Sequence, residues 1–198
     1  MPNHPPATQI RPTRDSVMSD RPTRAELTEA YGRSVPDLVG PGMRVLLVGI
    51  NPSLWSGWSG YHFGRPTNRL WRTLHLAGFT DRQLRPDETG ELLAAGIGIT
   101  NLVNRATARG DELTPAEIRA GVPRLRGLTE RWHPADVAVL GVTAYRVAFD
   151  QPRAQVGQQQ EGLAGARMWA LPNPSGLNAH YQQAELTAAY RALRSAAV

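Results

Sequence analysis

Two short apolar runs constrain the fold of this chain more than any other feature of its sequence. Residues 45–50 and 169–171 are almost entirely apolar, and each run leads into an Asn-Pro-Ser turn, at 51–53 and at 173–175. Unbroken apolar runs are typical of strands that are buried on both faces of a parallel sheet. Ligands bind at the carboxyl ends of such strands, so we expect both turns to lie on that edge and to face one site.

Strand-like and helix-like segments alternate along the rest of the chain. Strands are predicted at 43–49, 97–101, 136–141 and 166–171, and helices at 23–33, 68–77, 87–95, 114–132, 143–149 and 182–196. The alternation predicts an α/β fold: a three-layer α/β/α sandwich on a short, mainly parallel central sheet of four to five strands. We also expect a long loop over 50–66, and a loop or an edge hairpin over 151–164.

The N-terminal segment differs in composition from the rest. Residues 1–24 contain five prolines, four arginines and no apolar periodicity, which predicts a disordered basic tail. We expect residues 25–198 to form a single domain, because this length can bury a sizeable core. No apolar run is long enough to span a bilayer and no signal peptide is apparent, so a cytoplasmic protein is expected.

Composition excludes several kinds of chemistry. The chain has no cysteine, which rules out disulfides, thiol catalysis and cysteine-ligated metal clusters. All 22 basic residues are arginine, so no lysine can form a Schiff base. No phosphate-binding glycine motif or paired-histidine motif is present, and we expect neither a metal nor another cofactor. The net charge of +5 favours a polyanionic partner such as nucleic acid, although this indication alone is weak.

The two asparagines of the Asn-Pro-Ser turns are the candidate functional residues. An amide does not titrate near neutral pH, but its oxygen can orient a water molecule and its NH2 group can donate to a ligand. Such groups suit a reaction with a good leaving group, and cleavage of an N-glycosidic bond to a base that leaves as an anion is one. Alternatively, Asn51 and Asn173 simply end their strands in Asx turns. Two such turns on one sheet edge favour the functional interpretation.

These motifs resemble those of the mismatch-specific uracil/thymine-DNA glycosylases, a family of the uracil-DNA glycosylase superfamily. The similarity is carried by residues 49–52 and 173–177, extends through Phe63, 66–69, 77–84, 139–141 and the helix of Tyr145, and covers about residues 40–195. It implies an enzyme that flips uracil, or a related lesion such as ethenocytosine, out of double-stranded DNA at G·U mismatches. Apart from the resemblance, we expect a cofactor-free monomer, located in the cytoplasm of a bacterium and associated with the nucleoid.

The resemblance also implies a role for individual residues. Asn51 would hold the hydrolytic water, Phe63 would stack on the flipped base, and Ser56 would control tolerance of the thymine methyl group. The implied base pocket contains Gly49, Ile50, Pro52, Ser56, Phe63, Asn68 and Asn173. The residues implied in the DNA wedge or at phosphates are Ser53, Pro174, Ser175, Gly176, Leu177 and Asn178.

Three departures from the family pattern bear on substrate range. Ser53 replaces a usual glycine, which predicts a narrower pocket mouth, and Asn178-Ala179 replaces Ser-Arg, which predicts a weaker grip on the duplex. Trp55 and Trp58 add bulk to the predicted pocket loop. Candidate phosphate contacts are Arg65, Arg69 and Arg105, although a solvated arginine is the default interpretation of each. The acids that could assist the water are Asp81, Asp87 and Asp111, and each of these is more simply a helix cap or a surface charge.

Two other functions are compatible with the same residues. The chain could be a non-catalytic protein of the same fold that binds mismatched or abasic DNA, although an intact Asn51 argues against it. It could also hydrolyse free nucleosides or nucleotides, which the wedge-like pair Gly176-Leu177 and the basic composition disfavour.

Overall fold

The computed structural model describes residues 21–176, 178 and 180–197. The predicted N-terminal tail up to residue 20, Leu177 of the predicted wedge and Ala179 lie outside the described residues. The central sheet has five strands in the order β2-β1-β3-β5-β4. Its strands are β1 (Val45–Gly49), β2 (Ile97–Asn101), β3 (Asp136–Leu140), β4 (Gly157–Gln158) and β5 (Arg167–Leu171). The first four strands in that order are parallel, and β4 pairs antiparallel with β5 as an edge strand.

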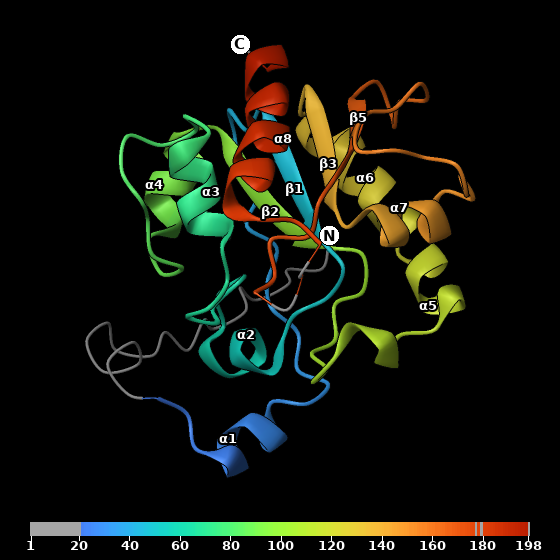
Figure 1. The fold of residues 1–198 in the computed structure, drawn as a ribbon. Helices are drawn as coiled ribbons and strands as arrows, with labels where there is room; N and C mark the ends of the chain where they lie inside the picture. Colours follow the sequence, from blue (N-terminus) through green and yellow to red (C-terminus); the bar gives the residue numbers. More distant parts are fainter. Residues whose placement is uncertain (1–20, 177, 179, 198) are drawn as a thin grey trace, which may run out of the picture.

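Helices cover both faces of the sheet, as Figure 1 shows. One layer contains α3 (Leu70–Leu76), α4 (Thr89–Ala94) and α8 (Gln183–Ala196), and the other contains α5 (Pro115–Ala120), α6 (Val122–Trp132) and α7 (Val142–Ala148). Successive residues of each strand supply the two layers: Leu47 packs in the first core and Leu46 in the second. The three-layer α/β/α fold with a mainly parallel sheet is thus confirmed, and no helix of its described residues is long and apolar enough to cross a membrane.

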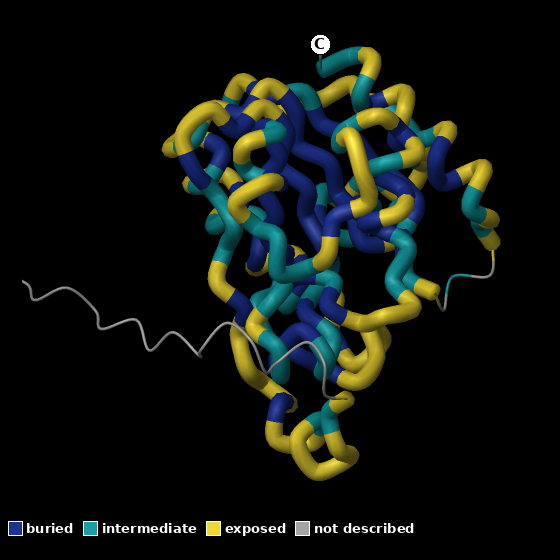
Figure 2. Tube along the Cα trace, turned by 90° about the vertical axis from the view of Figure 1, so that its left-hand side faces the viewer, coloured by how far each residue is buried: buried dark blue, intermediate teal, exposed yellow. Residues whose placement is uncertain are grey.

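Two short helices lie below the sheet in Figure 1, on the side of the strands' carboxyl ends: α1 (Arg24–Glu29) and α2 (Leu54–Ser59). The trace is mostly buried through the sandwich and exposed around α1 (Figure 2). Helix α2 falls in the segment that was predicted to be a loop, so that prediction is wrong for these residues. Ser53 caps the start of α2, and Gly60 ends it with a φ of +76°, a conformation that glycine adopts without strain.

The predicted helix over 114–132 is two helices, α5 and α6, that meet at Gly121. A Cβ atom at this position would collide with the backbone of Leu102, so the chain passes very close to the end of β2 here. Pro123 in the first turn of α6 lacks an N–H group, which favours a new helix start over continuation of α5. The capping box of Thr114 and Glu117 at the start of α5 is present as the sequence indicates.

Candidate active site

A cavity of about 150 Å³ opens at the carboxyl edge of the sheet. A cavity of roughly this volume takes up benzene in an engineered protein core, so the space suits a single six-membered ring. Both Asn51 and Asn173 line it, although 121 residues lie between them in the chain. The other lining residues are Ile50, Pro52, Ser53, Ser56, His62, Phe63, Arg65, Asn68, Asn101, Thr107, Ala108, Arg109, Gly110, Leu140 and Ser175.

The carboxamide of Asn51 is held in one orientation by the segment that follows β2. Its Nδ2 donates to the backbone oxygen of Arg105 at 2.9 Å and to Oγ1 of Thr107 at 2.7 Å. Thr107 is buried and donates in turn to the backbone oxygen of Arg109 at 2.7 Å, so its hydroxyl can only accept from Asn51. Both amide hydrogens of Asn51 are used in this way. No described residue donates to its Oδ1, which leaves this oxygen for a molecule in the cavity.

Asn173 lies in the cavity wall and also forms the Asx turn that was considered as an alternative. Its Oδ1 accepts a hydrogen bond from the backbone N–H of Ser175 at 2.9 Å. Nδ2 of Asn178 donates to the backbone oxygen of Asn173 at 2.9 Å and braces the same turn. The turn therefore occupies the side-chain oxygen of Asn173, and its NH2 group is the part that can donate to a bound molecule.

Helix α2 supplies Ser53 and Ser56 to the cavity. Oγ of Ser53 accepts from the backbone N–H of Ser56 at 3.2 Å and lies 3.2 Å from its hydroxyl. The buried Oγ of Ser56 also accepts from the backbone N–H of Gly64 at 3.3 Å. The hydroxyl of Ser53, which was predicted to contact phosphate, is thus engaged in starting the helix.

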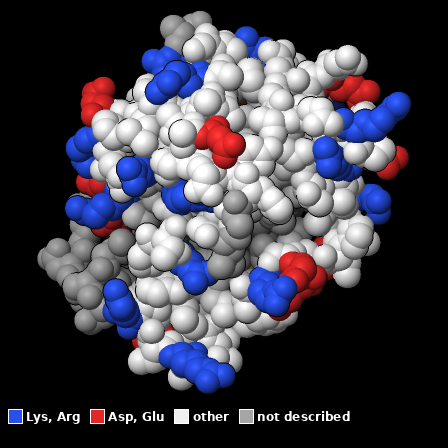
Figure 3. Space-filling model, in the orientation of Figure 1, with Lys and Arg blue, Asp and Glu red and all other residues white. Residues whose placement is uncertain are grey.

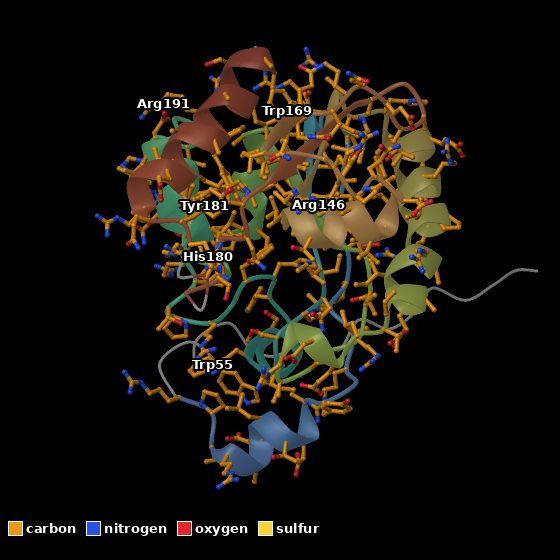
Figure 4. All side chains as sticks on the ribbon, turned by 45° about the vertical axis from the view of Figure 1, so that its right-hand side comes forward. Trp55, Arg146, Trp169, His180, Tyr181 and Arg191 are labelled. Carbon is orange, nitrogen blue, oxygen red and sulfur yellow. The ribbon has the colours of Figure 1, made fainter. Side chains whose placement is uncertain are left out.

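Trp55 and Trp58 belong to the predicted pocket loop, but neither lines the cavity. Their rings meet edge to face, with centroids 6.1 Å apart, on the helix that packs against α1. Trp55 lies well below the sheet and beside α1 in Figure 4. The helical turn of α2 accounts for the difference: it directs the serines to the cavity and the tryptophans away from it.

Asn101 and His62 form a buried pair in the cavity wall that the sequence analysis did not include in the site. Nε2 of His62 lies 2.9 Å from the backbone oxygen of Pro36, so this nitrogen carries the proton. Nδ1 of His62 consequently accepts from Nδ2 of Asn101, at 3.2 Å. Asn101 is the last residue of β2 and pairs with Gly49 in the sheet register. The rule that singled out Asn51, a polar residue at a strand's carboxyl end, would have found Asn101 as well.

Burial lowers the pKa of His62 from its usual 6.5, and this makes protein stability depend on pH. The unfolded chain binds the proton more readily than the folded protein, so we expect the free energy of unfolding to fall as pH drops below 6.5. Hydrogen bonds from Arg82 and Arg105 lower the pKa values of Glu88 and Glu117 to about 2. The stability that these two carboxylates contribute is lost mainly as the pH falls below 4.5, their pKa in the unfolded chain. Urea unfolding between pH 7.5 and about 5 isolates the histidine.

The matched variant for this measurement is His62→Gln, which cannot titrate. The wild type should lose more stability than this variant between the two pH values. Equal losses in the two proteins would contradict a neutral, buried His62.

Gly49 and Phe63 shape the floor of the cavity. A Cβ atom at position 49 would collide with Oδ1 of Asn101 and would lie 3.2 Å from Cζ of Phe63. Gly49 does not itself line the cavity; its missing side chain allows the other two to approach β1. Phe63 holds a φ of +50°, an uncommon conformation for a residue other than glycine. Asn68 also lines the cavity, and its Oδ1 accepts from the backbone N–H of Leu70 at the start of α3.

The predicted wedge and phosphate residues occupy the loop after β5, beside the cavity. Ser175 lines the cavity, whereas Pro174, Gly176 and Asn178 do not. The backbone oxygen of Pro174 accepts from the N–H of Arg69 at 3.0 Å. A Cβ atom at Gly176 would lie 2.7 Å from the backbone oxygen of Thr67, so the loop packs closely on the segment before α3.

The candidate charged residues differ in what they contact. The guanidinium of Arg69 binds backbone oxygens of the loop after β5, and that of Arg105 pairs with Glu117 at 2.7 Å, so neither is free for phosphate. Arg65 lines the cavity and is exposed, and its guanidinium has no partner among the described residues. On the face of the molecule that Figure 3 shows, basic side chains are spread widely, with acidic ones between them.

No carboxylate is found among the described residues that line the cavity. The acids considered as helpers of the water, Asp81, Asp87 and Asp111, lie elsewhere; Asp87 pairs with Arg85 and Asp111 with Arg109. Three or more potential metal ligands do not come together anywhere in the part of the chain that the structure describes. Apart from the guanidinium groups of Arg65 and Arg109, the polar side chains of this cavity are therefore amides, hydroxyls and a neutral imidazole.

Comparison with known proteins bears on the fold and on the family. The fold is similar to the solution NMR structure of a candidate uracil DNA glycosylase from Methanosarcina acetivorans, with a TM-score of 0.59 and 20% sequence identity over 82% of this chain and 98% of that one. Residues 36–194 match the uracil DNA glycosylase superfamily, a span that includes every element from β1 to the last turns of α8. The chain therefore belongs to the uracil-DNA glycosylase superfamily and is, at that level, a DNA glycosylase.

Proposed function

We propose that this protein is a monofunctional, mismatch-specific uracil-DNA glycosylase. It acts as a monomer on double-stranded DNA, flips uracil out of a G·U pair and hydrolyses its N-glycosidic bond; other damaged pyrimidines are further substrates. The observation that carries the proposal is the fixed carboxamide of Asn51. Its NH2 group is tied to Arg105 and Thr107, and its oxygen is left for a water molecule in a cavity that suits one pyrimidine ring.

The proposed reaction needs few protein groups. As the bond between C1′ and the base breaks, its electron pair leaves with the base, and the sugar becomes oxocarbenium-like. The water held by Oδ1 of Asn51 forms the new bond to C1′ and releases a proton to solvent. The NH2 group of Asn173 donates to the base and stabilises the negative charge that develops on it. Phe63 stacks on the base, and the buried pair of Asn101 and His62 keeps the pocket wall rigid.

Preference for G·U follows from the energy of base flipping. Extrusion of a base costs a few kcal/mol and least at a mismatch, so uracil opposite guanine is extruded more readily than uracil opposite adenine. Ser56 is 2% exposed and lines the cavity beside Ser53, and we propose that this wall decides whether the methyl group of thymine fits.

A panel of oligonucleotides tests the proposal under single-turnover conditions. Duplexes with G·U, A·U, G·T or ethenocytosine and a single strand with uracil are incubated with enzyme, and alkaline strand scission then reports base release. We expect fastest release from G·U, unchanged by EDTA. Tight binding to G·U or abasic DNA without release from any substrate would favour the non-catalytic DNA-binding function. Release of uracil from free deoxyuridine would favour a nucleoside hydrolase.

Two exposed arginines, Arg65 and Arg109, line the cavity, and Arg109 pairs with Asp111. We expect Arg65 to contact a phosphate next to the flipped nucleotide. Arg65→Ala should weaken duplex binding several-fold and reduce the slope of log K against log salt concentration by about 1, since one fewer counterion is released. Fluorescence anisotropy with an abasic duplex at a series of salt concentrations measures both. Arg126→Ala on α6, an exposed arginine outside the cavity lining, is the matched control, and an equal change in slope for both variants would contradict the contact.

A further inference from the structure

The guanidinium of Arg69 binds the loop after β5 through three hydrogen bonds. We define the second-motif loop as the described residues of 173–181. Nη1 of Arg69 donates to the backbone oxygen of Tyr181 at 2.7 Å. Nη2 donates to the backbone oxygens of Ser175 and Asn178 at 2.8 and 2.9 Å. One planar guanidinium thus joins the beginning, the middle and the end of this loop. Figure 4 shows the end of the loop, His180 and Tyr181, at the edge of the sandwich that faces α2.

The position of Arg69 is unfavourable for the helix it precedes. It is the N-cap residue of α3, makes no side-chain capping bond, and places a cation at the positive end of the helix dipole. None of the ion pairs between described residues includes Arg69, and its Nε is buried without a hydrogen-bond partner. A capping serine or aspartate would suit the helix better. The compensating interaction is the set of loop oxygens.

The second-motif loop contacts Arg69 and Thr67 through its backbone atoms. The backbone N–H of Arg69 donates to Pro174, and the close approach of Gly176 to Thr67 leaves no room for a side chain. Residues of the loop line the cavity and also an adjoining groove of about 630 Å³, where Asn178, His180 and Tyr181 contribute. Arg69 itself lines neither of these hollows. Arg69 therefore orders the loop without occupying the surface that would meet DNA.

We propose that Arg69 is a positioning residue that holds the second-motif loop in the shape that engages duplex DNA. This inference rests on the proposed function. A loop that is ordered before binding loses less conformational entropy when it inserts into a duplex, so association is tighter. The fork of an arginine is required, because an ammonium group is a point charge that cannot bond three oxygens in this arrangement.

Three variants test the proposal with the full chain. Arg69→Lys keeps the charge, Arg69→Met removes it, and Arg72→Met on the exposed side of α3 is the matched control. For G·U duplex under single-turnover conditions, we expect the half-saturating enzyme concentration to rise about tenfold or more in both Arg69 variants and to stay unchanged in the control, as loss of a charge-assisted hydrogen-bonded group predicts. The rate with single-stranded uracil, which needs no duplex insertion, should change by less than about threefold.

Equal losses on duplex and single-stranded substrates would overturn the proposal in favour of a general structural role, and full activity of Arg69→Lys would overturn the need for the fork. A second measurement does not depend on catalysis. Hydrogen exchange of the backbone N–H of Asn178, which bonds to Ser175 within the loop, should be faster in Arg69→Lys than in the wild type. Unchanged exchange would show that Arg69 does not hold the second-motif loop, and would overturn the proposal. Absence of base release by the wild type would instead overturn the proposed function, with the exchange result still interpretable.

Discussion

Asn51→Ala should reduce base release from G·U duplex by at least about 10²-fold, because a water molecule that is no longer held in line with C1′ attacks only rarely. The change removes the oxygen that faces the cavity, together with the two hydrogen bonds that Nδ2 donates to Arg105 and Thr107. The loss should therefore appear in the maximal single-turnover rate. Binding to an abasic duplex, measured by anisotropy, should stay within about threefold of the wild type, since the substituted side chain contacts water and not phosphate.

The matched control is Asn104→Ala, on the segment after β2. Asn104 accepts a hydrogen bond from the backbone N–H of Val35 and does not line the cavity. Its replacement should lower stability by about 1 kcal/mol, the usual net value of one hydrogen bond, and leave the rate of base release unchanged. Full activity of Asn51→Ala would refute the water-holding role and with it the proposed mechanism.

Gly49→Ala should have the second-largest effect, although it adds one carbon atom. The new Cβ would displace Oδ1 of Asn101 and press on Phe63, so the two walls of the base pocket must shift. Overpacking of this kind costs about 1–3 kcal/mol in stability, and a displacement of about 1 Å at a reacting site can cost 10²-fold in rate. We expect a rate loss of about that size, with unfolding in urea at a lower midpoint.

Gly127→Ala in α6 serves as the control for Gly49→Ala. No atom lies within 4 Å of the Cβ that it would add, and alanine in a helix interior is favoured over glycine by roughly 0.5–1 kcal/mol. This variant should be slightly more stable than the wild type and fully active. A Gly49→Ala protein with normal activity would show that Asn101 and Phe63 can move freely, and that the pocket does not need their close approach.

The sheet could be predicted because its strands are marked by composition alone. The strands of the parallel set carry buried apolar runs, and each is followed by a segment with helical periodicity, as at Asp136–Leu140 before Val142–Ala148. Such a pattern has one compact solution, with helices on both faces. The edge strand β4 was anticipated only as a loop or hairpin, because two residues carry no periodicity.

Helix α2 was missed for a related reason. Six residues with two tryptophans and a glycine have little intrinsic helix preference, and the helix exists because Ser53 and Gly60 define its ends and α1 packs beside it. The direction of Trp55 depends on that helix and could not be inferred from a loop. Tertiary contacts of this kind have no local signal.

The candidate site, too, could be predicted only in part from the sequence. That the two Asn-Pro-Ser turns lie on one edge follows from strand direction, and both asparagines line one cavity; their catalytic roles remain predictions. The partners of Asn51 could not be foreseen, since Arg105 and Thr107 belong to an irregular segment with no motif. For Arg69 the sequence offered only a candidate phosphate contact or a solvated side chain, because its sequence context shows its charge and not the backbone oxygens that it binds.

The neutral state of His62 has a consequence for substrate choice. Its protonated nitrogen is committed to the backbone oxygen of Pro36, and the described lining offers no acid that could transfer a proton to a departing base. Under the proposed mechanism each base must then leave as an anion, carried only by hydrogen bonds. Bases that hold a negative charge easily should be released fastest, so this pocket selects lesions by how readily their own glycosidic bond breaks as much as by their shape.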